Sequence, residues 1–578
     1  MSKELTLEIK KVEILFLLII LSVVFYLDFR TTLKTPINFG DEGFHTRIAQ
    51  WIAQEKDYFA WSPLGGKKPI DGFDRPPLWN LTEAAFFFIF GFNEIIAKIL
   101  PPLIAFFTGI LIYLMVKQLY NKETAFLASI ISVTVPSFVT YSVLLYTDVL
   151  FTFYFSLFVF SLMVFMKKND KKYLLISCIF AGFSILTKLP GISSLTILSV
   201  IFLYDLFSKK TKLIDLVKFY IPFLFLVLII TSGFLIRNIY YFKTPMCGLP
   251  IPFIDEECEK DLPKFDKSFP QRTEEIGTET NVLKMGLINY LSFAYGYIWV
   301  VVFGFCGGIL LILAKKEKSD IILLLVLLGT APLLFQKIYQ RAEDTARYLL
   351  MLVPLVSLLA SRYFSEIYFY MRKSDTILVI VTLIVILIPI FSREFNIKLY
   401  FVYLGVFGII LYFGYSSKNI RDYASLSIFL FIILFSFIHL KQKNDIMFQV
   451  KQFSPMYFKA CEWIKENTPK DSVIMTIWSN RAIYNCQRNV MGNIPDISLS
   501  TDVNYTLNKA KEFGVTHIFL HKFSLSNEPM AEKYTVEFAS FLESHPEHFV
   551  NIFENGPKLD ECLQMGGCDG NIVYEVRY

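Results

Sequence analysis

The chain has 578 residues, of which 54% are hydrophobic and 19% charged, with a formal net charge of +5. A mean hydropathy of +0.49 is too high for a soluble globular protein of this size, so the composition predicts a polytopic membrane protein. The lysines cluster in short turns between apolar runs. The small positive charge therefore indicates membrane orientation, and we infer no nucleic-acid partner.

Apolar runs along the chain predict the membrane spans. The first, from Val12 to Leu27, lacks a small-residue cleavage site, and we interpret it as a retained helix and not as a secretory signal. Later runs are each long enough to cross a bilayer. They cover residues 84–116, 124–139, 149–166, 173–187, 190–207, 217–236, 288–314, 320–336, 347–365, 376–391, 399–414 and 424–440. The sequence thus predicts about 13 transmembrane helices.

Basic residues predict the orientation of these spans. With the N-terminus in the cytoplasm, every turn on the cytoplasmic side contains lysine or arginine, as in the turns at 167–172 and 315–318. The expected location is a cell membrane, crossed many times. The loop at 29–83, the loop at 237–287 and everything after residue 440 would then lie outside.

The chain divides at residue 440 in this interpretation. Residues 1–440 would form a membrane-embedded domain with the external loop 29–83, and residues 441–578 an extracytoplasmic domain. In the second part, helical and strand patterns alternate, which predicts a small α/β fold. Helices are expected at 455–466, 507–513 and 531–542, and strands at 472–478, 515–521, 549–553 and 572–576.

Six of the eight cysteines fall in the segments predicted to lie outside. An even number fits disulfide formation, and the sequence neighbours Cys247/Cys258 and Cys562/Cys568 leave Cys461/Cys486 as a third pair. The alternative is that all six are free thiols.

An acidic pair, Asp41 and Glu42, follows the first span and precedes an amphipathic stretch that includes Phe44 and Ile48. We expect this stretch to be a helix along the membrane surface, with the carboxylates at its N-terminus, where the helix dipole stabilises negative charge. A carboxylate held there can accept a proton from a hydroxyl nucleophile. Alternatively, the pair only starts the helix. His45, four residues after Asp41, would share its face.

Several cations are expected near the same surface. Arg75 precedes a double proline that forces an extended entry into the next helix, so it would sit just above the bilayer, either near a lipid phosphate or as a snorkelling anchor. Lys188 lies on a predicted outer turn, against the usual charge bias. Arg237, Arg341 and Arg347 close or open further outer turns. Such groups can surround a phosphate or pyrophosphate.

A further acid, Asp148, lies where two predicted spans meet at the outer side. Charges in or beside apolar spans are costly and tend to line functional cavities. The plain alternative is a polar residue in a turn.

These elements in this order resemble the GT-C glycosyltransferases of the dolichyl-phosphate-mannose protein mannosyltransferase and aminoarabinose transferase group (PMT-type), over roughly residues 10–365. The resemblance is carried by Asp41-Glu42, Arg75-Pro76-Pro77-Leu78-Trp79, Phe90-Gly91, Asp148, Leu186-Thr187-Lys188 and Arg347-Tyr348.

The resemblance implies roles for these residues. Asp41 would be the catalytic carboxylate, Glu42 its structural or acceptor-orienting neighbour, and Asp148 a second acidic contributor to the cavity. Three cations, Arg75, Lys188 and Arg347, would face the lipid phosphate, and Tyr348 would also line the cavity. The external α/β part differs from that of the protein mannosyltransferases, so neither the sugar nor the acceptor follows from the resemblance.

The expected function is transfer of a sugar from a polyprenyl-phosphate donor to an acceptor hydroxyl at the outer face, inverting the anomeric centre in one displacement. The acceptor could be a lipid, a glycan or a protein, and membrane lipids would surround the enzyme. A divalent metal is possible, although no metal-binding motif occurs. The alternatives are a polytopic transporter, which would more often show repeated halves, and a non-catalytic membrane receptor with an external domain.

Overall fold

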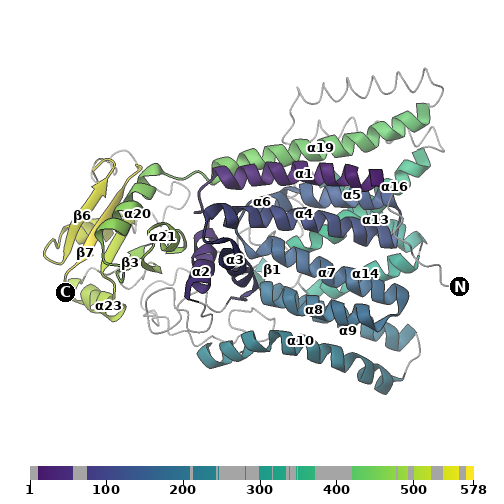
Figure 1. Ribbon diagram of the computed structural model, residues 1–578, viewed down its shortest axis with the longest axis horizontal. Helices are drawn as coiled ribbons and strands as arrows, with labels where there is room; N and C mark the ends of the chain where they lie inside the picture. The colour runs from purple at the N-terminus through teal and green to yellow at the C-terminus, as the bar shows by residue number, and fades with distance from the viewer. Residues whose placement is uncertain are drawn as a thin grey trace.

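Two structural parts make up the protein, a long bundle of helices and a β-sheet at one end of it (Figure 1). The computed structural model describes residues 11–55, 75–208, 212–242, 245, 280–281, 298–315, 317–332, 337–338, 347, 349–371, 420–476, 479–492, 500, 502–522, 538–558, 561 and 568–578.

Long apolar segments form the helices of the bundle, because an apolar stretch in a membrane must satisfy its backbone groups internally. They are α1 (Lys11–Lys34), α4 (Glu94–Leu119), α5 (Lys122–Thr134), α6 (Pro136–Ser142), α7 (Thr147–Lys168), α8 (Lys171–Thr187), α9 (Ser193–Ser208), α10 (Leu213–Phe242), α13 (Ile298–Lys315), α14 (Lys318–Thr330), α16 (Val353–Met371) and α19 (Ile420–Val450). Short 3-10 turns precede two of them, η1 (Leu189–Ile192) and η3 (Leu350–Leu352).

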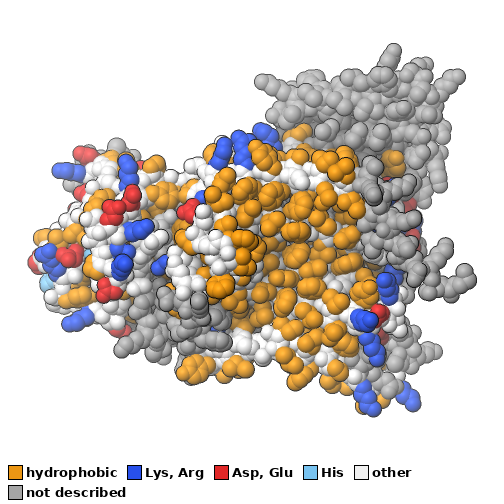
Figure 2. Space-filling view, viewed as in Figure 1, with side chains coloured by type: hydrophobic (Ala, Val, Ile, Leu, Met, Phe, Trp, Pro, Cys, Tyr) orange, Lys and Arg blue, Asp and Glu red, His pale blue; other side chains and the backbone are white. Residues whose placement is uncertain are grey.

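Within the described residues, six helices are long and apolar enough to cross a membrane, or seven if α5 and α6, bent by 61°, form one span. Hydrophobic side chains cover the face of the bundle that Figure 2 shows. Large apolar side chains of the helices, among them Phe16, Phe88, Phe225 and Leu310, are 53–68% exposed. A multi-pass membrane protein is therefore supported. The predicted spans 376–391 and 399–414 lie outside the described residues, and the count of 13 stays a prediction.

Two predicted boundaries differ from the structure. The first helix continues beyond Leu27 to Lys34, because the fully buried Asp28 accepts hydrogen bonds from Ser142 (2.7 Å) and Asn444 (2.8 Å) inside the bundle. The predicted span 84–116 is divided into α3 (Leu78–Phe90) and α4, since Gly91 adopts a φ of +80°. The expected loop 29–83 therefore contains the end of α1 and the start of α3.

A five-stranded mixed sheet forms the C-terminal part, in the order β4-β3-β5-β7-β6. Its strands are β3 (Val473–Thr476), β4 (Asn489–Gly492), β5 (His517–His521), β6 (Phe549–Asn555) and β7 (Asn571–Val576). The first three are parallel, and β7 pairs antiparallel with both β5 and β6. Two further short strands, β1 (Thr280–Asn281) and β2 (Lys337–Ile338), pair with each other elsewhere.

Helices α20 (Pro455–Asn467), α21 (Ser479–Asn485) and α23 (Val503–Glu512) accompany this sheet. The elements expected near 455–466, 472–478, 507–513, 515–521, 549–553 and 572–576 are all observed, whereas α21 and β4 were not expected. The predicted pair Cys461–Cys486 forms a disulfide, and Cys568 is also disulfide-bonded. Cys247, Cys258 and Cys562 lie outside the described residues.

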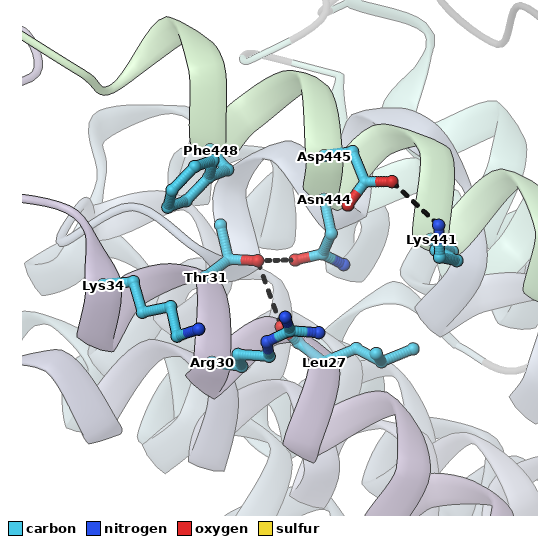
Figure 3. A pocket seen from close by; sticks show the side chains of 8 residues that line it. All are labelled: Leu27, Arg30, Thr31, Lys34, Lys441, Asn444, Asp445 and Phe448. Carbon is cyan, nitrogen blue, oxygen red and sulfur yellow. Dashed lines mark hydrogen bonds and ion pairs between the residues drawn. The ribbon is translucent and has the colours of Figure 1, made fainter.

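The two parts meet around α2 (Glu42–Glu55), which packs against α3 on one side and α21 on the other. Its apolar residues Phe44 and Ile48 are buried inside the protein, so the expected helix exists but is covered by the C-terminal part. The last helix of the bundle, α19, runs beside α1 (Figure 1). Between these two helices lies a pocket of about 220 Å³, lined by Arg30, Lys34 and Asn444 among others (Figure 3).

Candidate active site

The predicted carboxylate Asp41 lies at the first turn of α2. Its backbone carbonyl accepts the first helical hydrogen bond, from His45 at 3.0 Å, so Asp41 is the N-cap residue of this helix. In its side chain, Oδ2 accepts a hydrogen bond from Nη1 of Arg75 at 2.9 Å and lies 3.6 Å from Nη1 of Arg347.

Asp148, at the start of α7, is fully buried and holds two cations. Its Oδ1 lies 2.5 Å from Nζ of Lys188, and its Oδ2 accepts a hydrogen bond from Nε of Arg347 at 2.9 Å. The single guanidinium of Arg347 thus contacts both carboxylates. We call Asp41, Arg75, Asp148, Lys188 and Arg347 the charged cluster.

Helix ends explain why these residues meet. Asp148 follows directly on the start of α7, Lys188 is the C-cap residue of α8, and Arg347 comes just before η3. Arg75 precedes Pro76 and Pro77, which lie directly before α3. In Figure 1, α3, α7 and α8 reach the end of the bundle beside α2, so polar residues at the ends of apolar helices gather there.

Within the described residues, the charged cluster brings three cations to two carboxylates. Burial raises the pKa of Asp41, but the nearby Arg75 and Arg347 outweigh it and hold this pKa well below its usual range. Aromatic rings also support the cations, since Arg347 lies 4.5 Å from the ring centroid of Tyr146 and Arg75 lies 5.2 Å from that of Phe44.

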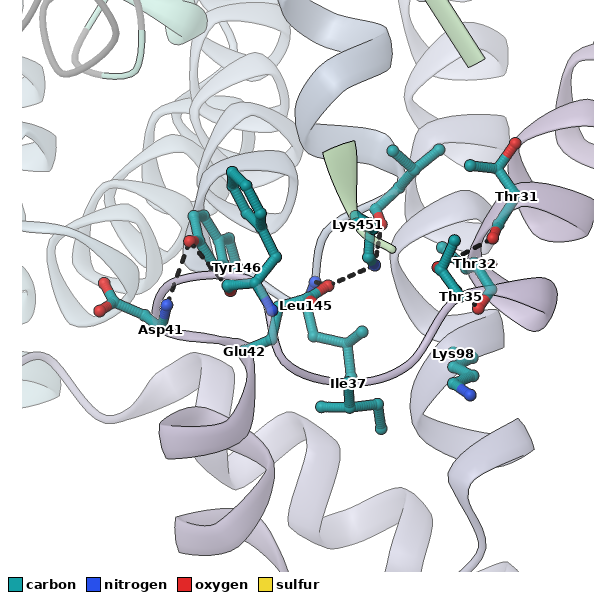
Figure 4. A network of polar contacts seen from close by, with 12 residues as sticks. Thr31, Thr32, Thr35, Ile37, Asp41, Glu42, Lys98, Leu145, Tyr146 and Lys451 are labelled. Atoms are coloured by element: carbon teal, nitrogen blue, oxygen red, sulfur yellow. Dashed lines mark hydrogen bonds and ion pairs between the residues drawn. The ribbon is translucent and has the colours of Figure 1, made fainter. Parts of the chain in front are cut away.

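Glu42 has a different environment from its neighbour Asp41. Its side chain is 0% exposed, and Oε1 lies 2.6 Å from Nζ of Lys451 (Figure 4). The backbone amides of Leu145 and Phe39 also donate to this carboxylate, at 3.2 and 3.0 Å. Glu42 is therefore enclosed by the protein, and its cation partner Lys451 is not a member of the charged cluster.

The side chain of Tyr146 holds the backbone of the turn that contains Asp41. Its hydroxyl accepts a hydrogen bond from the amide of Asp41 at 3.1 Å and donates to the carbonyl of Phe39 at 3.3 Å. The glycine between them, Gly40, has a φ of +50° and lets the tyrosine approach the backbone closely. The direction of Asp41 is thus set by contacts with the segment that precedes α7.

His45 lies within the same region and is 1% exposed. Burial, with a smaller effect from Arg75, lowers its pKa to about 4, so the ring is neutral at neutral pH. Its Nδ1 lies 2.8 Å from Oδ1 of Asn80. Because an amide oxygen only accepts, Nδ1 carries the proton and Nε2 presents a lone pair. Within the described residues this Nε2 has no hydrogen-bond partner.

The structure does not bring every predicted residue together. Arg237, on α10, donates to Asn238 at 3.0 Å, and among the described residues no ion pair joins it to the charged cluster. Arg341 and Tyr348 lie outside the described residues. In the part of the chain that the structure describes, no group of three His, Cys, Asp or Glu side chains is arranged to hold a metal ion.

Two residues of this site were not singled out from the sequence. Tyr146 stands beside Asp148, so its position next to a candidate acid was a usable signal. Lys451 comes shortly after two other lysines, Lys441 and Lys443. No feature of the local sequence distinguishes it from them. Its contact with Glu42 spans 409 positions of the chain, which is visible only in the folded structure.

Comparison with known protein families gives one match. Residues 74–236 match the family described as dolichyl-phosphate-mannose-protein mannosyltransferase. This segment contains Arg75, Asp148 and Lys188. No curated protein matches the chain by sequence.

Solved structures resemble the whole chain. ArnT from Cupriavidus metallidurans, bound to undecaprenyl phosphate, aligns with a TM-score of 0.59 and 10% identity over 96% of this chain and 97% of that one. The Archaeoglobus fulgidus oligosaccharyltransferase in its apo form gives 0.56 and 13%, over 97% of this chain and 74% of that one. The A. fulgidus AglB complex with an inhibitory peptide and a dolichol-phosphate gives 0.53 and 13%, over 94% and 73%.

At such low identity these structures show the fold. Together with the family match, they confirm the resemblance inferred from the sequence: the chain shares its fold with ArnT and with the A. fulgidus oligosaccharyltransferase, and its residues 74–236 are similar to the dolichyl-phosphate-mannose-protein mannosyltransferase family.

Proposed function

We propose that this protein is a membrane glycosyltransferase that moves a sugar from a polyprenyl-phosphate donor to an acceptor hydroxyl at the outer face of the membrane. The observation that carries the proposal is the shared guanidinium of Arg347, which joins Asp41 to Asp148 although 107 positions separate these two acids. Undecaprenyl phosphate and dolichol-phosphate are the ligands named for two of the similar structures.

The charged cluster suggests how the donor binds. A sugar linked through a polyprenyl phosphodiester carries one negative charge beside its anomeric carbon. Arg75, Lys188 and Arg347 would hold that phosphate, and its arrival would draw Arg75 and Arg347 away from Asp41. Because these cations keep the pKa of Asp41 low, their partial transfer to the phosphate would make the carboxylate a stronger base.

The reaction would then be a single displacement. The acceptor oxygen attacks the anomeric carbon as its proton passes to the carboxylate of Asp41, and the bond from that carbon to the phosphate oxygen breaks. The electron pair leaves with the phosphate, whose growing charge is stabilised by the cations. The configuration at the anomeric carbon is inverted, and the product lipid is a polyprenyl phosphate.

The variant Asp41→Asn tests this function, with Asp445→Asn on exposed α19 surface as control. Removing a general base costs about 100- to 10,000-fold in rate. We expect Asp41→Asn to lose transfer from lipid-linked sugar while remaining folded and still binding polyprenyl phosphate, and Asp445→Asn to keep wild-type rates. Turnover within about threefold of wild type in Asp41→Asn would exclude the proposed role.

Mass spectrometry of lipid-linked sugars and surface glycans in a deletion strain would identify donor and acceptor.

A further inference from the structure

The pair of Glu42 and Lys451 connects the end of the bundle's last helix to the turn that carries Asp41. Both side chains are almost completely buried, at 0% and 1% exposure, and their charged atoms lie 2.6 Å apart (Figure 4). Lys451 follows directly on α19 and precedes α20. The ammonium group therefore stands at the junction between the bundle and the C-terminal part.

Each residue of this pair also forms hydrogen bonds with backbone atoms near Asp41. Nζ of Lys451 donates to the carbonyl of Val143 at 3.0 Å, and Glu42 accepts from the amides of Leu145 and Phe39. Two chain segments, 39–42 and 143–146, are thus joined through one ion pair. Because Tyr146 in the second segment holds the amide of Asp41, the ion pair and the tyrosine fix the same turn from two directions.

Side chains of α21 and α19 contact the approach to this turn at other points. Asn485, at the end of α21, donates to the carbonyl of Ile37 at 3.4 Å. Asn444, on α19, donates to Asp28 at 2.8 Å and accepts from Thr31 at 2.6 Å. Residues from Asp28 to Glu42 are therefore held by side chains that come more than 400 positions later in the chain.

We propose that Lys451 is a positioning residue for sugar transfer, which aims the carboxylate of Asp41 through its ion pair with Glu42. The inference rests on the proposed function of Asp41. It makes the C-terminal part of the chain a component of the active site, although that part contributes no member of the charged cluster. Displacement of a catalytic group by about 1 Å can lower a rate about 100-fold, so loss of this contact lowers kcat.

Lys451→Met and Glu42→Gln test the proposal in the full-length protein, reconstituted with a polyprenyl-phosphate sugar. We expect kcat to fall about 100-fold in each, while the KM for the donor changes by less than about threefold, because Arg75, Lys188 and Arg347 remain. Lys451→Arg, which keeps the charge, should recover part of kcat. Lys441→Gln removes a lysine from exposed α19 surface, where it pairs only with Asp445 among the described residues, and should leave kcat unchanged.

The double variant Glu42→Gln/Lys451→Met separates positioning from stability. A single substitution leaves a buried charge without its partner and can unfold the protein, whereas removing both charges is often neutral for stability. We expect the double variant to recover the melting temperature but keep the low kcat of either single variant, because one contact is removed in all three. Wild-type kcat in the folded double variant, or in Lys451→Met, would overturn the proposal. If Asp41→Asn retained activity, the proposed function itself would fail, whatever Lys451 does.

Discussion

The hydroxyl of Tyr146 lies so close to the backbone of Gly40 that a Cβ atom placed there would be 2.0 Å from it. Real Cβ atoms essentially never show contacts this short, so a side chain at position 40 would force Tyr146 to shift. The φ of +50° at the same residue independently favours glycine. The turn before Asp41 is therefore closed by a residue without a side chain and by a tyrosine 106 positions later.

Gly40→Ala should consequently displace Tyr146 and with it the amide of Asp41. We expect at least about tenfold lower turnover, since small misplacement of a catalytic group is costly, and a lower melting temperature. The double variant Gly40→Ala/Tyr146→Phe removes the hydroxyl that the new Cβ meets. It should recover part of the stability lost in Gly40→Ala but not full turnover, because the bond to Asp41 is absent. A fully active Gly40→Ala variant would contradict this contact between Tyr146 and Gly40.

The members of the charged cluster could be recognised in the sequence because charged residues are rare in their surroundings. Asp148 and Lys188 stand between apolar spans, and Arg75 precedes two prolines, so each was conspicuous. Local patterns likewise located most elements of the C-terminal part, since caps and hydrophobic periodicity are encoded within a few residues.

Long-range contacts were not accessible in the same way. Lys451 resembles the exposed Lys441 in sequence, yet its side chain is 1% exposed because the two parts of the protein close over it. Burial of α2 between α3 and α21 was missed for the same reason, since an amphipathic helix has the same pattern whether its apolar face meets lipid or protein. The break between α3 and α4 at Gly91 was also not predicted, because it depends on one glycine within an apolar run.

Buried His45 makes stability depend on pH. Its pKa is lowered from 6.5 to about 4 in the folded protein, so the unfolded chain binds more protons between these values. The stabilisation is complete above pH 6.5 and is lost as the pH falls towards 4, by about 3 kcal/mol at most. His45→Gln, which cannot titrate but can donate to Asn80, should show a smaller decrease in melting temperature from pH 7 to pH 5. An unchanged pH dependence in His45→Gln would argue against a neutral histidine.

Arg347 contacts two carboxylates with different nitrogen atoms, Nε to Asp148 at 2.9 Å and Nη1 to Asp41 at 3.6 Å. Lysine offers a single ammonium group and cannot reproduce this fork. We expect Arg347→Lys to weaken binding of polyprenyl phosphate and to lower turnover by about 10- to 100-fold, since a lost charged hydrogen bond costs about 1.5–3 kcal/mol. Titration with undecaprenyl phosphate and transfer kinetics measure the two effects. The exposed Arg577→Lys serves as control, and equal affinity in both variants would remove Arg347 from the donor site.

The disulfide between Cys461 and Cys486 closes a loop of 25 residues and joins α20 to the end of α21. Cross-linking a loop of this size stabilises a fold by about 3 kcal/mol, chiefly by restricting the unfolded chain. Because α21 packs on α2, loosening it should also disturb the helix that begins beside Asp41. We expect Cys461→Ala/Cys486→Ala to melt at a lower temperature, and to lose transfer activity at temperatures where the wild type is still active.

Reductant should destabilise the wild type in the same direction, whereas Cys306→Ala, which removes a free thiol, should leave that response unchanged. If the double variant lost stability but kept its activity up to its own melting temperature, the packing of α21 on α2 would be irrelevant to the reaction, and the dependence of Asp41 on the C-terminal part would be confined to Lys451.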